Sequence, residues 1–494
     1  MQPGPSTYRS ITRFVRFLLD RWFRGIEVTG LEHLPTEGGG ILVSWHPNGL
    51  LDPALIVAHF PGHVVFGARH GLFRWPGLGA MMKATGAVPI YRAMDATGMS
   101  EAERRAQNAR SLDALAHAVA DGRFSCLFPE GDSHDHPHVL ELKTGVARFY
   151  ARARELTPDD NPPPVILPVG LHYADKDSFR SYALVAFHPP LRIPESVLAA
   201  ASSDPERLTN VIEEELREVV HATESWELHY LMHRARKIVR AERARRSGDE
   251  STLPPTMSER TMGLQEIWAA YYAGLESHPQ DVALLQARVF EYDADLRSLG
   301  LEDHELDRSP RESRPLRVLA LAAQLALVFV LLPALLVFGV VVNAPAALAL
   351  VATSKAFAKR RKDEATIKLL LGTVLLPASW ALAGWLTYRG SEAIYRLDRS
   401  LPDAPMTAAV IVVALGVIGG MVAMRYVRMV RETLRAMRVR LTRGQRRNAL
   451  IHLLAERAEI YDELATLAAE LAHDEVDELT GAASDAAATA PGVT

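Results

Sequence analysis

The sequence is poor in several features that define common protein classes. Its 494 residues include one cysteine, Cys126, so the chain has no intramolecular disulfide and no cluster of thiolate metal ligands. Its 55 basic residues are balanced by 59 acidic ones, and no basic nucleic-acid motif stands out, so we expect no nucleic-acid partner. A GxSxG nucleophile elbow is not evident either, which argues against a serine hydrolase.

The N-terminus also lacks the uninterrupted apolar run of a cleavable signal peptide, so the soluble part of the chain is expected to stay in the reducing cytoplasm. Residues 8–24 instead place seven apolar residues at helical spacing between arginines. This pattern predicts that residues 1–25 form an amphipathic helix lying in the surface of an anionic membrane. The alternative is an ordinary domain helix with a solvated basic face.

Long uncharged stretches are present in the second half of the chain. Residues 318–354, 369–388 and 404–424 are 37, 20 and 21 residues long and carry no charge. A bilayer core needs about 20 apolar residues per helix, so we predict a transmembrane region over residues 316–424. The alternative is one buried soluble core.

The distribution of lysine and arginine predicts how these stretches cross the membrane. The positive-inside rule is satisfied if the first stretch forms a tight or re-entrant hairpin, bent near Pro333 or at residues 343–345. The two later stretches then cross the membrane, and the first half of the chain lies on the cytoplasmic face. In a bacterium this would be the inner or plasma membrane.

Seven short apolar segments alternate with helical patterns in the first half of the chain. Strands alternating with helices predict an α/β domain, here over residues 26–203, with substantial parallel pairing and ligands beyond the strand ends. The expected strands are residues 26–29, 41–45, 62–68, 86–92, 124–128, 165–171 and 182–187.

The remaining segments are expected to be helical or disordered. Residues 204–315 have amphipathic helical patterns interrupted by a linker. Residues 425–479 are predicted to be a cytoplasmic helical region, with one long helix over residues 425–472 that is basic first and acidic later. Residues 480–494 are rich in small residues and are predicted to be disordered.

One histidine and one aspartate, His46 and Asp52, lie six residues apart directly after an apolar run. On a continuous helix they would point away from each other, but the turn residues Pro47, Asn48 and Gly49 supply a bend. A histidine held by a carboxylate can take a proton from a hydroxyl group. The alternative is that Asp52 only caps a helix.

Four sequence blocks occur in order: HPNGLLD at 46–52, GAVPIYR at 86–92, FPEGDSHD at 128–135 followed by LKTGVA at 142–147, and VILPVGL at 165–171. Together they resemble the membrane glycerolipid acyltransferases, also called the phosphate or lysophosphatidate acyltransferase superfamily. The third block and FRSYA at 179–183 are similar to the yeast-type glycerol-3-phosphate and dihydroxyacetone-phosphate acyltransferases. The resemblance covers residues 25–194.

The resemblance implies a mixed, partly parallel sheet flanked by helices, followed by a helical insert, transmembrane helices and a long C-terminal helix. It implies an O-acyltransferase of phospholipid biosynthesis that moves an acyl group from acyl-coenzyme A or acyl carrier protein to glycerol 3-phosphate or dihydroxyacetone phosphate. The donor is a co-substrate, and no cofactor or metal is expected. The alternatives are a lysophosphatidate acceptor, or a catalytically inactive lipid-binding scaffold. The sequence leaves the oligomeric state open.

The resemblance also implies a set of site residues. His46 and Asp52 would be catalytic, and Arg92 and Lys143 would hold the acceptor phosphate, although both also suit ordinary surface charges. Pro168 would shape a strand end beneath the acyl donor. The substrate-binding set as a whole is Gly86, Arg92, Glu130, Gly131, Ser133, His134, Lys143, Pro168 and Arg180.

Two features depart from the wider family. Five residues separate His46 from Asp52 instead of four, a spacing that the yeast-type branch shares. Gly131-Asp132-Ser133 stands where many lysophosphatidate enzymes have Gly-Thr-Arg, so Lys143 or Arg180 would replace the missing arginine.

The alternate histidines His134, His136 and His138 raise the hypothesis of a zinc site. Pro137 interrupts this run, and the family block explains His134 directly. We therefore expect no metal here.

Overall fold

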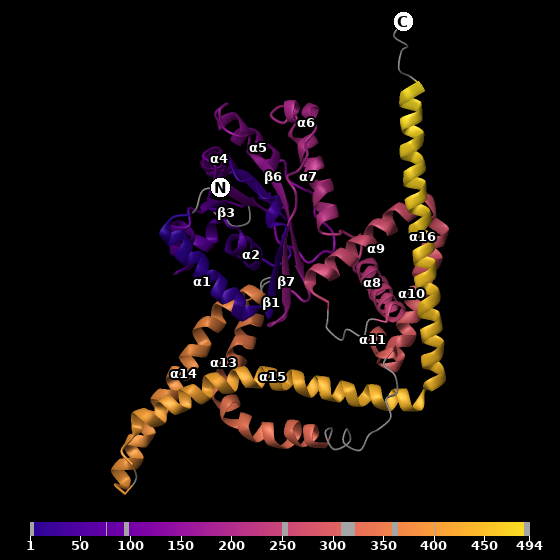
Figure 1. The fold of residues 1–494 in the computed structure, drawn as a ribbon. Helices are drawn as coiled ribbons and strands as arrows, with labels where there is room; N and C mark the ends of the chain where they lie inside the picture. The colour runs from indigo at the N-terminus through magenta and orange to yellow at the C-terminus, as the bar shows by residue number, and fades with distance from the viewer. Residues whose placement is uncertain are drawn as a thin grey trace. The chain divides into compact units, whose positions relative to one another are not determined.

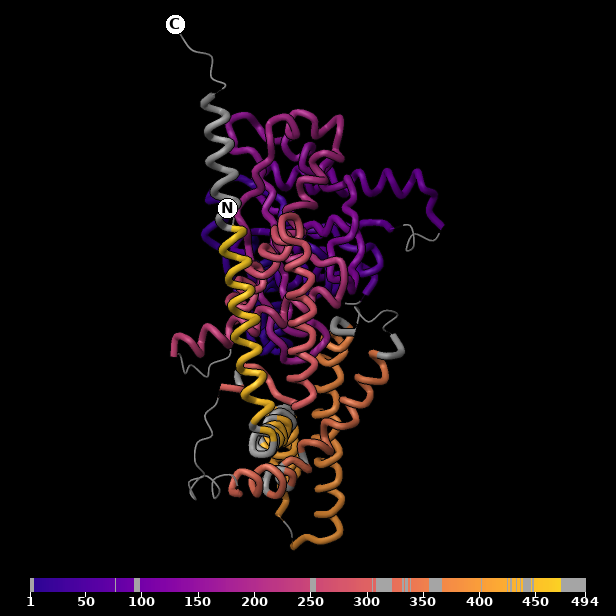
Figure 2. The backbone as a smooth tube through the Cα atoms, turned by 90° about the vertical axis from the view of Figure 1, so that its right-hand side faces the viewer, coloured from indigo at the N-terminus to yellow at the C-terminus, as the bar shows by residue number. Residues whose placement is uncertain are grey.

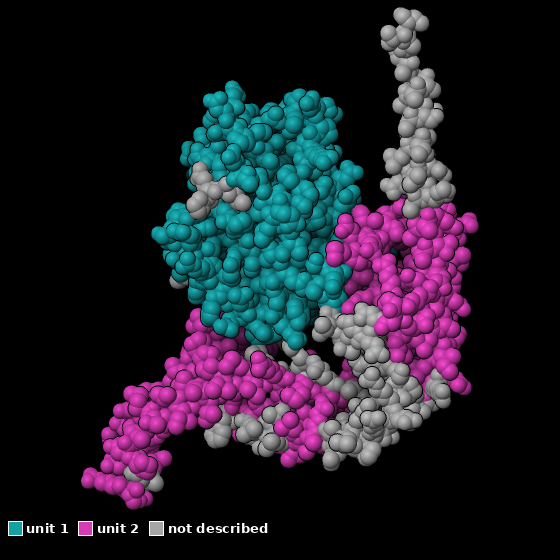
Figure 3. Space-filling view, in the orientation of Figure 1, with its two compact units in different colours: residues 1–229, 255–261, 355–369 teal, residues 230–254, 262–354, 370–494 magenta. Residues whose placement is uncertain are grey.

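The computed structural model divides the chain into two units, which Figure 3 colours separately. The first unit comprises residues 1–229, 255–261 and 355–369, and the second comprises residues 230–254, 262–354 and 370–494. The residues that the structure describes are 4–75, 77–92, 98–248, 255–307, 322–357, 364–400 and 402–488.

The first unit is built on a seven-stranded sheet with the order β1-β7-β6-β2-β5-β3-β4 (Figure 1). All neighbouring strands are parallel except β6 and β7, which are antiparallel. The predicted mixed, partly parallel sheet is therefore confirmed. The strands are β1 (Gly25–Thr29), β2 (Gly40–Val43), β3 (Val64–Arg69), β4 (Val88–Ile90), β5 (Phe124–Leu127), β6 (Val165–Tyr173) and β7 (Tyr182–Phe187).

Helices cover both faces of this sheet. Side chains alternate between the faces of a strand, so Ile41 and Val43 pack in the core cluster with α4, α5 and α7, whereas Leu42 packs with α1 and α2. The helices of this unit are α1 (Ser6–Trp22), α2 (Leu51–His59), α3 (Leu78–Ala84), α4 (Glu101–Ala120), α5 (Gly145–Leu156), α6 (Glu195–Ala200) and α7 (Pro205–Val219).

Helix α7 changes the predicted domain boundary. Its residues Leu208, Ile212 and Leu216 are fully buried in the core beneath the sheet. The boundary expected between residues 203 and 204 is therefore too early, because an amphipathic pattern does not indicate which surface will cover its apolar face.

Helix α1 packs into the first unit with one side, and its other side includes the face predicted to contact a membrane. Leu19 and Trp22 are buried in the core, and the Arg16 guanidinium donates a hydrogen bond of 3.0 Å to the Ala58 carbonyl of α2. Phe14 and Phe17 remain 49% and 51% exposed. Part of the predicted basic face thus contacts protein, while an aromatic and basic face stays open to solvent.

The second unit is helical. Helices α10 and α16 lie side by side in it, as the views of Figure 1 and Figure 2 both show. The helical region predicted over residues 204–315 is also interrupted at residues 220–225, where His221 has a φ of 52°. The helices in or entering this unit are α8 (Trp226–Ser247), α9 (Met257–Ser277), α10 (Pro279–Leu299), α11 (Asp303–Leu306), α13 (Leu332–Phe357), α14 (Glu364–Leu397), α15 (Pro405–Gln445) and α16 (Arg447–Ala488).

Two segments of these helices are long and apolar enough to cross a bilayer, namely Ile367–Leu397 and Pro405–Ala423. The third predicted stretch contains a shorter apolar segment, Gly339–Ser354. Helix α13 continues through Pro345, so the predicted bend at residues 343–345 is wrong. Near the other predicted bend, at Pro333, the structure has a π-helical segment, Leu327–Leu331, directly before α13. Residues 318–321, which begin the predicted stretch, lie outside the described residues.

Asn343 contacts the neighbouring helices near this position. Its side-chain amide donates to the carbonyls of Gly339 and Gly416, each at 2.7 Å, and its oxygen accepts from Trp380 Nε1 at 3.0 Å. The asparagine therefore joins α13, α14 and α15 instead of opening a turn, as polar residues between apolar helices often do.

The C-terminal part also differs from the prediction. Helix α15 continues from its apolar half into its basic half, and a break at Arg446 separates it from α16. The single helix expected over residues 425–472 is therefore two helices. Helix α16 reaches Ala488, so the part of the predicted disordered tail up to residue 488 is helical, and residues 489–494 lie outside the described residues.

Candidate active site

The candidate site lies where several parallel strands end. His46 follows β2, Glu130 follows β5 and Tyr173 ends β6, and both β5 and β6 run parallel to β2. The carboxyl ends of these three strands therefore meet at one edge of the sheet, which is where ligands bind in open α/β sheets.

His46 and Asp52 contact each other as the sequence predicts. Nδ1 of His46 lies 2.8 Å from Oδ2 of Asp52, and the Asn48 backbone N–H donates to the same oxygen at 2.7 Å. Gly49 has a φ of 53°, a left-handed conformation that favours glycine in this tight bend. The bend places Asp52 in the first turn of α2, where its carboxylate is fully buried.

This contact assigns the two ring nitrogens of His46. Because Nδ1 donates to the carboxylate, Nε2 is the nitrogen that can accept a proton. The imidazole is 13% exposed and stacks on the Phe128 ring, with the ring centroids 4.2 Å apart. The site thus holds a solvent-reachable base in one tautomer and one orientation.

Tyr173, which the sequence analysis did not select, completes the surroundings of Asp52. Its hydroxyl donates to Oδ1 of Asp52. Burial, then the charge of Asp52 and this hydrogen bond, raise the pKa of the Tyr173 phenol well above its ordinary value. The phenol therefore stays neutral and acts as a donor, so the carboxylate accepts hydrogen bonds from His46, Asn48 and Tyr173.

Glu130 connects the third sequence block to the first. Its Oε2 accepts from the His46 backbone N–H at 2.9 Å, and its Oε1 accepts from Leu140 N–H at 3.0 Å and lies 2.7 Å from His134 Nε2. The His134 N–H donates in turn to the His46 carbonyl at 3.0 Å. Both carboxylate oxygens of this buried residue thus hold the backbone that carries His46.

His134 is occupied in the same network. Its Nδ1 accepts from the backbone N–H of His136 at 3.2 Å, so its Nε2 carries the proton that is donated to Glu130. Both ring nitrogens of His134 thus contact the protein. The substrate-binding role of His134 stays a prediction.

The two predicted phosphate-binding cations lie next to the third block. Arg92 Nη1 pairs with Asp132 Oδ1 at 3.0 Å, and the Ser133 N–H donates to the same oxygen at 2.9 Å. Lys143 lies across Gly131, whose φ is 75°, and a Cβ at Gly131 would collide with the Lys143 ammonium. The left-handed backbone conformation favours glycine here, and a larger residue would also require the flexible end of Lys143 to move.

Lys176 is a second residue that the sequence analysis missed. Its Nζ lies 2.8 Å from Asp135 Oδ1 and donates to the Pro47 carbonyl at 3.1 Å, and its carbonyl accepts from the Asn48 amide at 3.0 Å. The side chain is only 15% exposed. A partly buried ammonium thus contacts the bend between His46 and Asp52.

Two predicted site residues lie elsewhere, and a third lies in the sheet next to the site. Gly86, with a φ of 80°, precedes β4 and closes α3 at the amino ends of the strands, so it is at the opposite edge of the sheet. Pro168 is inside β6 and pairs with Val43, the last residue of β2, so it lies level with the carboxyl end of that strand. Arg180 donates to the Phe23 carbonyl at 3.0 Å at the end of α1. The structure gives Gly86 and Arg180 roles in the backbone turns and leaves Pro168 within the sheet.

Tyr173 and Lys176 could have been identified from their positions two and five residues after the VILPVGL block. Residues at the carboxyl end of a parallel strand are candidates for a site, and β6 extends to Tyr173, two residues beyond that block. The expected strand ended at residue 171, which left both side chains in an unassigned loop.

The sequence comparisons agree with this fold and site. Residues 25–172 match the acyltransferase family, so this sheet and its histidine–aspartate pair form an acyltransferase domain. Residues 256–474 match the glycerol-3-phosphate acyltransferase 2 C-terminal domain. The chain therefore carries matches to both an acyltransferase domain and a glycerol-3-phosphate acyltransferase C-terminal domain.

Three fungal proteins are similar to parts of the chain. An uncharacterized acyltransferase of Schizosaccharomyces pombe is 22% identical over 385 residues, which cover 60% of this chain and 55% of that protein. Glycerol-3-phosphate O-acyltransferase 1 of Saccharomyces cerevisiae is 29% identical over 202 residues, 40% of this chain and 25% of its own length. Glycerol-3-phosphate O-acyltransferase 2 of the same yeast is 26% identical over 185 residues, which cover 36% of this chain and 23% of that protein. The chain thus spans about half or less of each relative.

Proposed function

We propose that the chain transfers an acyl group from an acyl thioester to a hydroxyl of glycerol 3-phosphate and so forms lysophosphatidate. The observation that carries this proposal is the 2.8 Å contact between His46 Nδ1 and the buried Asp52 carboxylate, which leaves Nε2 as a base at the strand ends. The relatives named glycerol-3-phosphate O-acyltransferases support the choice of acceptor.

The proposed reaction is a direct acyl transfer. The acceptor hydroxyl oxygen attacks the thioester carbonyl carbon, and His46 Nε2 takes the hydroxyl proton as the new C–O bond forms. The C–S bond of the tetrahedral intermediate then breaks, and the imidazolium returns the proton to the departing thiolate. A thiol has a pKa of about 8.5 and leaves readily, so the proposed reaction uses no cofactor or metal. General-base assistance typically contributes about 10²- to 10⁴-fold.

Cations near the bend would hold the acceptor phosphate. We assign this role to Lys176 and Lys143, joined by Arg92 when the phosphate replaces Asp132 as its partner. A phosphate dianion needs fixed, charged donors, and charge-assisted hydrogen bonds are the strongest available. Glu130 is a positioning residue in this proposal, because both of its oxygens accept from the chain.

The proposed reaction takes place at a membrane surface. The two candidate spans support membrane association, and we propose that the acyltransferase domain lies on the cytoplasmic face. The exposed Phe14 and Phe17, together with neighbouring arginines, would contact anionic lipid through the open face of α1.

Separate acyl-transfer assays test the acceptor. The purified full chain in nanodiscs is given a radiolabelled acyl thioester with glycerol 3-phosphate, dihydroxyacetone phosphate or lysophosphatidate as the single acceptor. We expect glycerol 3-phosphate to be acylated, and His46→Ala to lower kcat by about 10²- to 10⁴-fold. Consumption of lysophosphatidate alone would overturn the proposed acceptor. Full activity of the His46→Ala variant would overturn the mechanism.

A further inference from the structure

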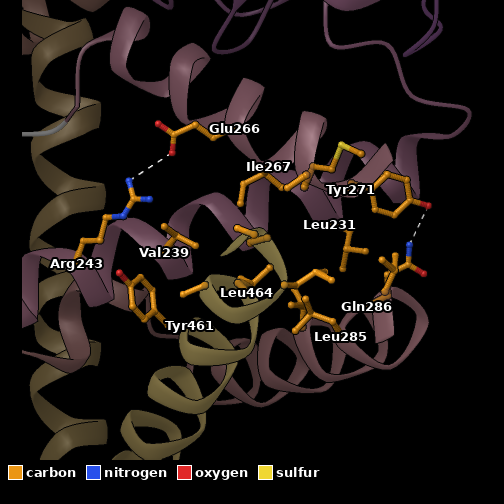
Figure 4. A pocket seen from close by; sticks show the side chains of 18 residues that line it. Leu231, Val239, Arg243, Glu266, Ile267, Tyr271, Leu285, Gln286, Tyr461 and Leu464 are labelled. Atoms are coloured by element: carbon orange, nitrogen blue, oxygen red, sulfur yellow. Dashed lines mark hydrogen bonds and ion pairs between the residues drawn. The ribbon is translucent and has the colours of Figure 1, made fainter. Parts of the chain in front are cut away.

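The second unit contains a pocket that the proposed chemistry does not use. It has a volume of about 290 Å³ and lies between α8, α9, α10 and α16 (Figure 4). Its walls are mainly aliphatic, and each helix contributes to them. Leu231, Val239, Ile267, Leu285 and Leu464 are among the lining residues.

Small residues make room for this pocket. Ala235 of α8, Ala270 of α9, and Ala465 and Ala468 of α16 all line it. Protein interiors are usually packed with few voids larger than a water molecule. Ala235 is buried, whereas Ala465 and Ala468 are exposed, so these small side chains leave an apolar space that is open on the α16 side.

Polar pairs lie at two opposite sides of the apolar walls, as Figure 4 shows. On one side Arg243 pairs with Glu266 at 3.4 Å, and these side chains are 60% and 59% exposed. On the other side the Gln286 amide donates to the Tyr271 hydroxyl at 3.1 Å. Arg243 and Glu266 are exposed whereas Tyr271 and Gln286 are only partly exposed, so the arginine side is the more open of the two polar sides and is taken as the mouth of the pocket.

A second guanidinium, that of Arg246, lies near the pocket but is already paired with Glu242 and Asp462 at 2.9 and 2.8 Å. Arg246 lies over the ring of Tyr461, a lining residue, at 4.5 Å from the ring centroid. In the part of the chain that the structure describes, Arg243 pairs with Glu266 at a long distance of 3.4 Å in a solvent-exposed position, and such pairs contribute little. An anion at the mouth could therefore replace Glu266 at small cost.

We propose that this pocket binds one acyl chain of an anionic single-chain lipid, with the chain between the four helices and the head group at Arg243. The aliphatic walls offer few groups to hydrogen-bond a sugar or a nucleotide. The pocket volume of about 290 Å³ is close to the lower limit of the roughly 300–1,000 Å³ found for ligand pockets. Such a volume suits one acyl chain and not two. Fatty acylate and lysophosphatidate share this chemistry, and the proposal does not depend on the transferase activity.

Photolabelling of the full chain in nanodiscs tests the proposal. Diazirine-bearing palmitate and diazirine-bearing lysophosphatidate are used in separate arms, and labelled peptides are identified by mass spectrometry. We expect saturable labelling of pocket-lining peptides of α8, α10 or α16. The arm with the tighter competition by unlabelled lipid identifies the source of the acyl chain.

Neighbouring alanines of α16 provide a matched pair of variants. Ala468 and Ala469 are both exposed, but Ala468 lines the pocket and Ala469 does not. Ala468→Trp should lower the labelling of these peptides at least about tenfold, a difference of about 1.4 kcal/mol, and Ala469→Trp should leave it unchanged. At the mouth, Arg243→Gln should weaken competition by the anionic lipid, and Glu266→Gln should strengthen it.

Three outcomes would overturn the proposal. The first is equal labelling of the two tryptophan variants, and the second is no saturable labelling of the pocket peptides in either arm. The third is a change of oligomeric state caused by Ala468→Trp without pocket labelling, which would make a second copy of the chain the occupant.

Discussion

The Tyr173 hydroxyl donates a hydrogen bond to Oδ1 of Asp52, while His46 Nδ1 contacts the other oxygen of the same carboxylate. The end of β6, the first turn of α2 and the loop after β2 therefore meet at one buried group. The orientation of the proposed base depends on a residue that follows it by more than a hundred positions.

Tyr173→Phe tests this dependence. The variant keeps the ring but removes one donor from a buried carboxylate, where hydrogen bonds to charged groups contribute about 1.5–3 kcal/mol. We expect kcat to fall about tenfold or more while the KM of each substrate changes less than about twofold. Steady-state kinetics with both substrates measures this. A raised KM with an unchanged kcat would instead show that Tyr173 contacts substrate.

Glu130→Gln should impair both folding and activity. Both carboxylate oxygens face donors, so the amide NH₂ of glutamine must point at an N–H group. An unsatisfied buried group costs about 1–3 kcal/mol. We expect a lower Tm and a lower kcat, measured by thermal unfolding and acyl transfer.

The control for this variant is Glu141→Gln, because Glu141 is exposed on the same segment. It should change neither quantity. Equal behaviour of the two variants would contradict the positioning role of Glu130.

Lys176→Met should weaken binding of the acceptor. The substitution removes the ammonium near the Pro47 carbonyl and leaves Asp135 without that ion pair. We expect the KM for glycerol 3-phosphate to rise about tenfold, equivalent to about 1.4 kcal/mol, with a smaller change in the KM of the acyl donor.

Two further variants separate this role from a general loss of charge. Lys83→Met, at an exposed lysine of α3, should have no effect. Asp135→Asn should lower the KM for the acceptor, because it releases the Lys176 ammonium from a competing carboxylate. A fall in kcat alone in Lys176→Met would indicate that the lysine only supports the loop.

Glu242 should make the stability of the second unit depend on pH. Burial opposes its charge, but hydrogen bonds from Arg245 and Arg246 and the charge of the buried Arg457 lower its pKa to about 2. A depressed carboxyl pKa contributes stability that is full above the ordinary value, about 4.5, and is lost as the pH falls toward 2.

Glu242→Gln should therefore destabilise the protein by about 3–5 kcal/mol at pH 7, the usual effect of breaking a buried ion pair. The difference from the unsubstituted chain should shrink as the pH falls below about 4.5. Thermal unfolding of the chain in nanodiscs between pH 7 and pH 3 measures this. Glu266→Gln, at an exposed pair, should change stability by less than about 1 kcal/mol at any pH. A constant gap across this pH range would contradict the linkage to Glu242.

Local patterns predict much of this protein correctly. The seven strands follow from short apolar segments between turn residues, and the contact of His46 with Asp52 follows from the turn chemistry at Pro47 to Gly49. Two apolar segments long enough to cross a bilayer follow from composition alone. In each case the residues that decide the structure are neighbours in the chain, so their side-chain preferences are enough.

Tertiary packing controls the remaining features. The strand order β1-β7-β6-β2-β5-β3-β4 brings Tyr173 and Glu130 to the His46 loop, and it leaves Gly86 at the opposite edge of the sheet. The same packing buries α7 beneath the sheet and carries α13 through Pro345 with Asn343 bonded to its neighbours. The periodicity of a segment states which of its faces is apolar, but the partner of that face lies far away in the sequence, and only the folded chain brings the two together.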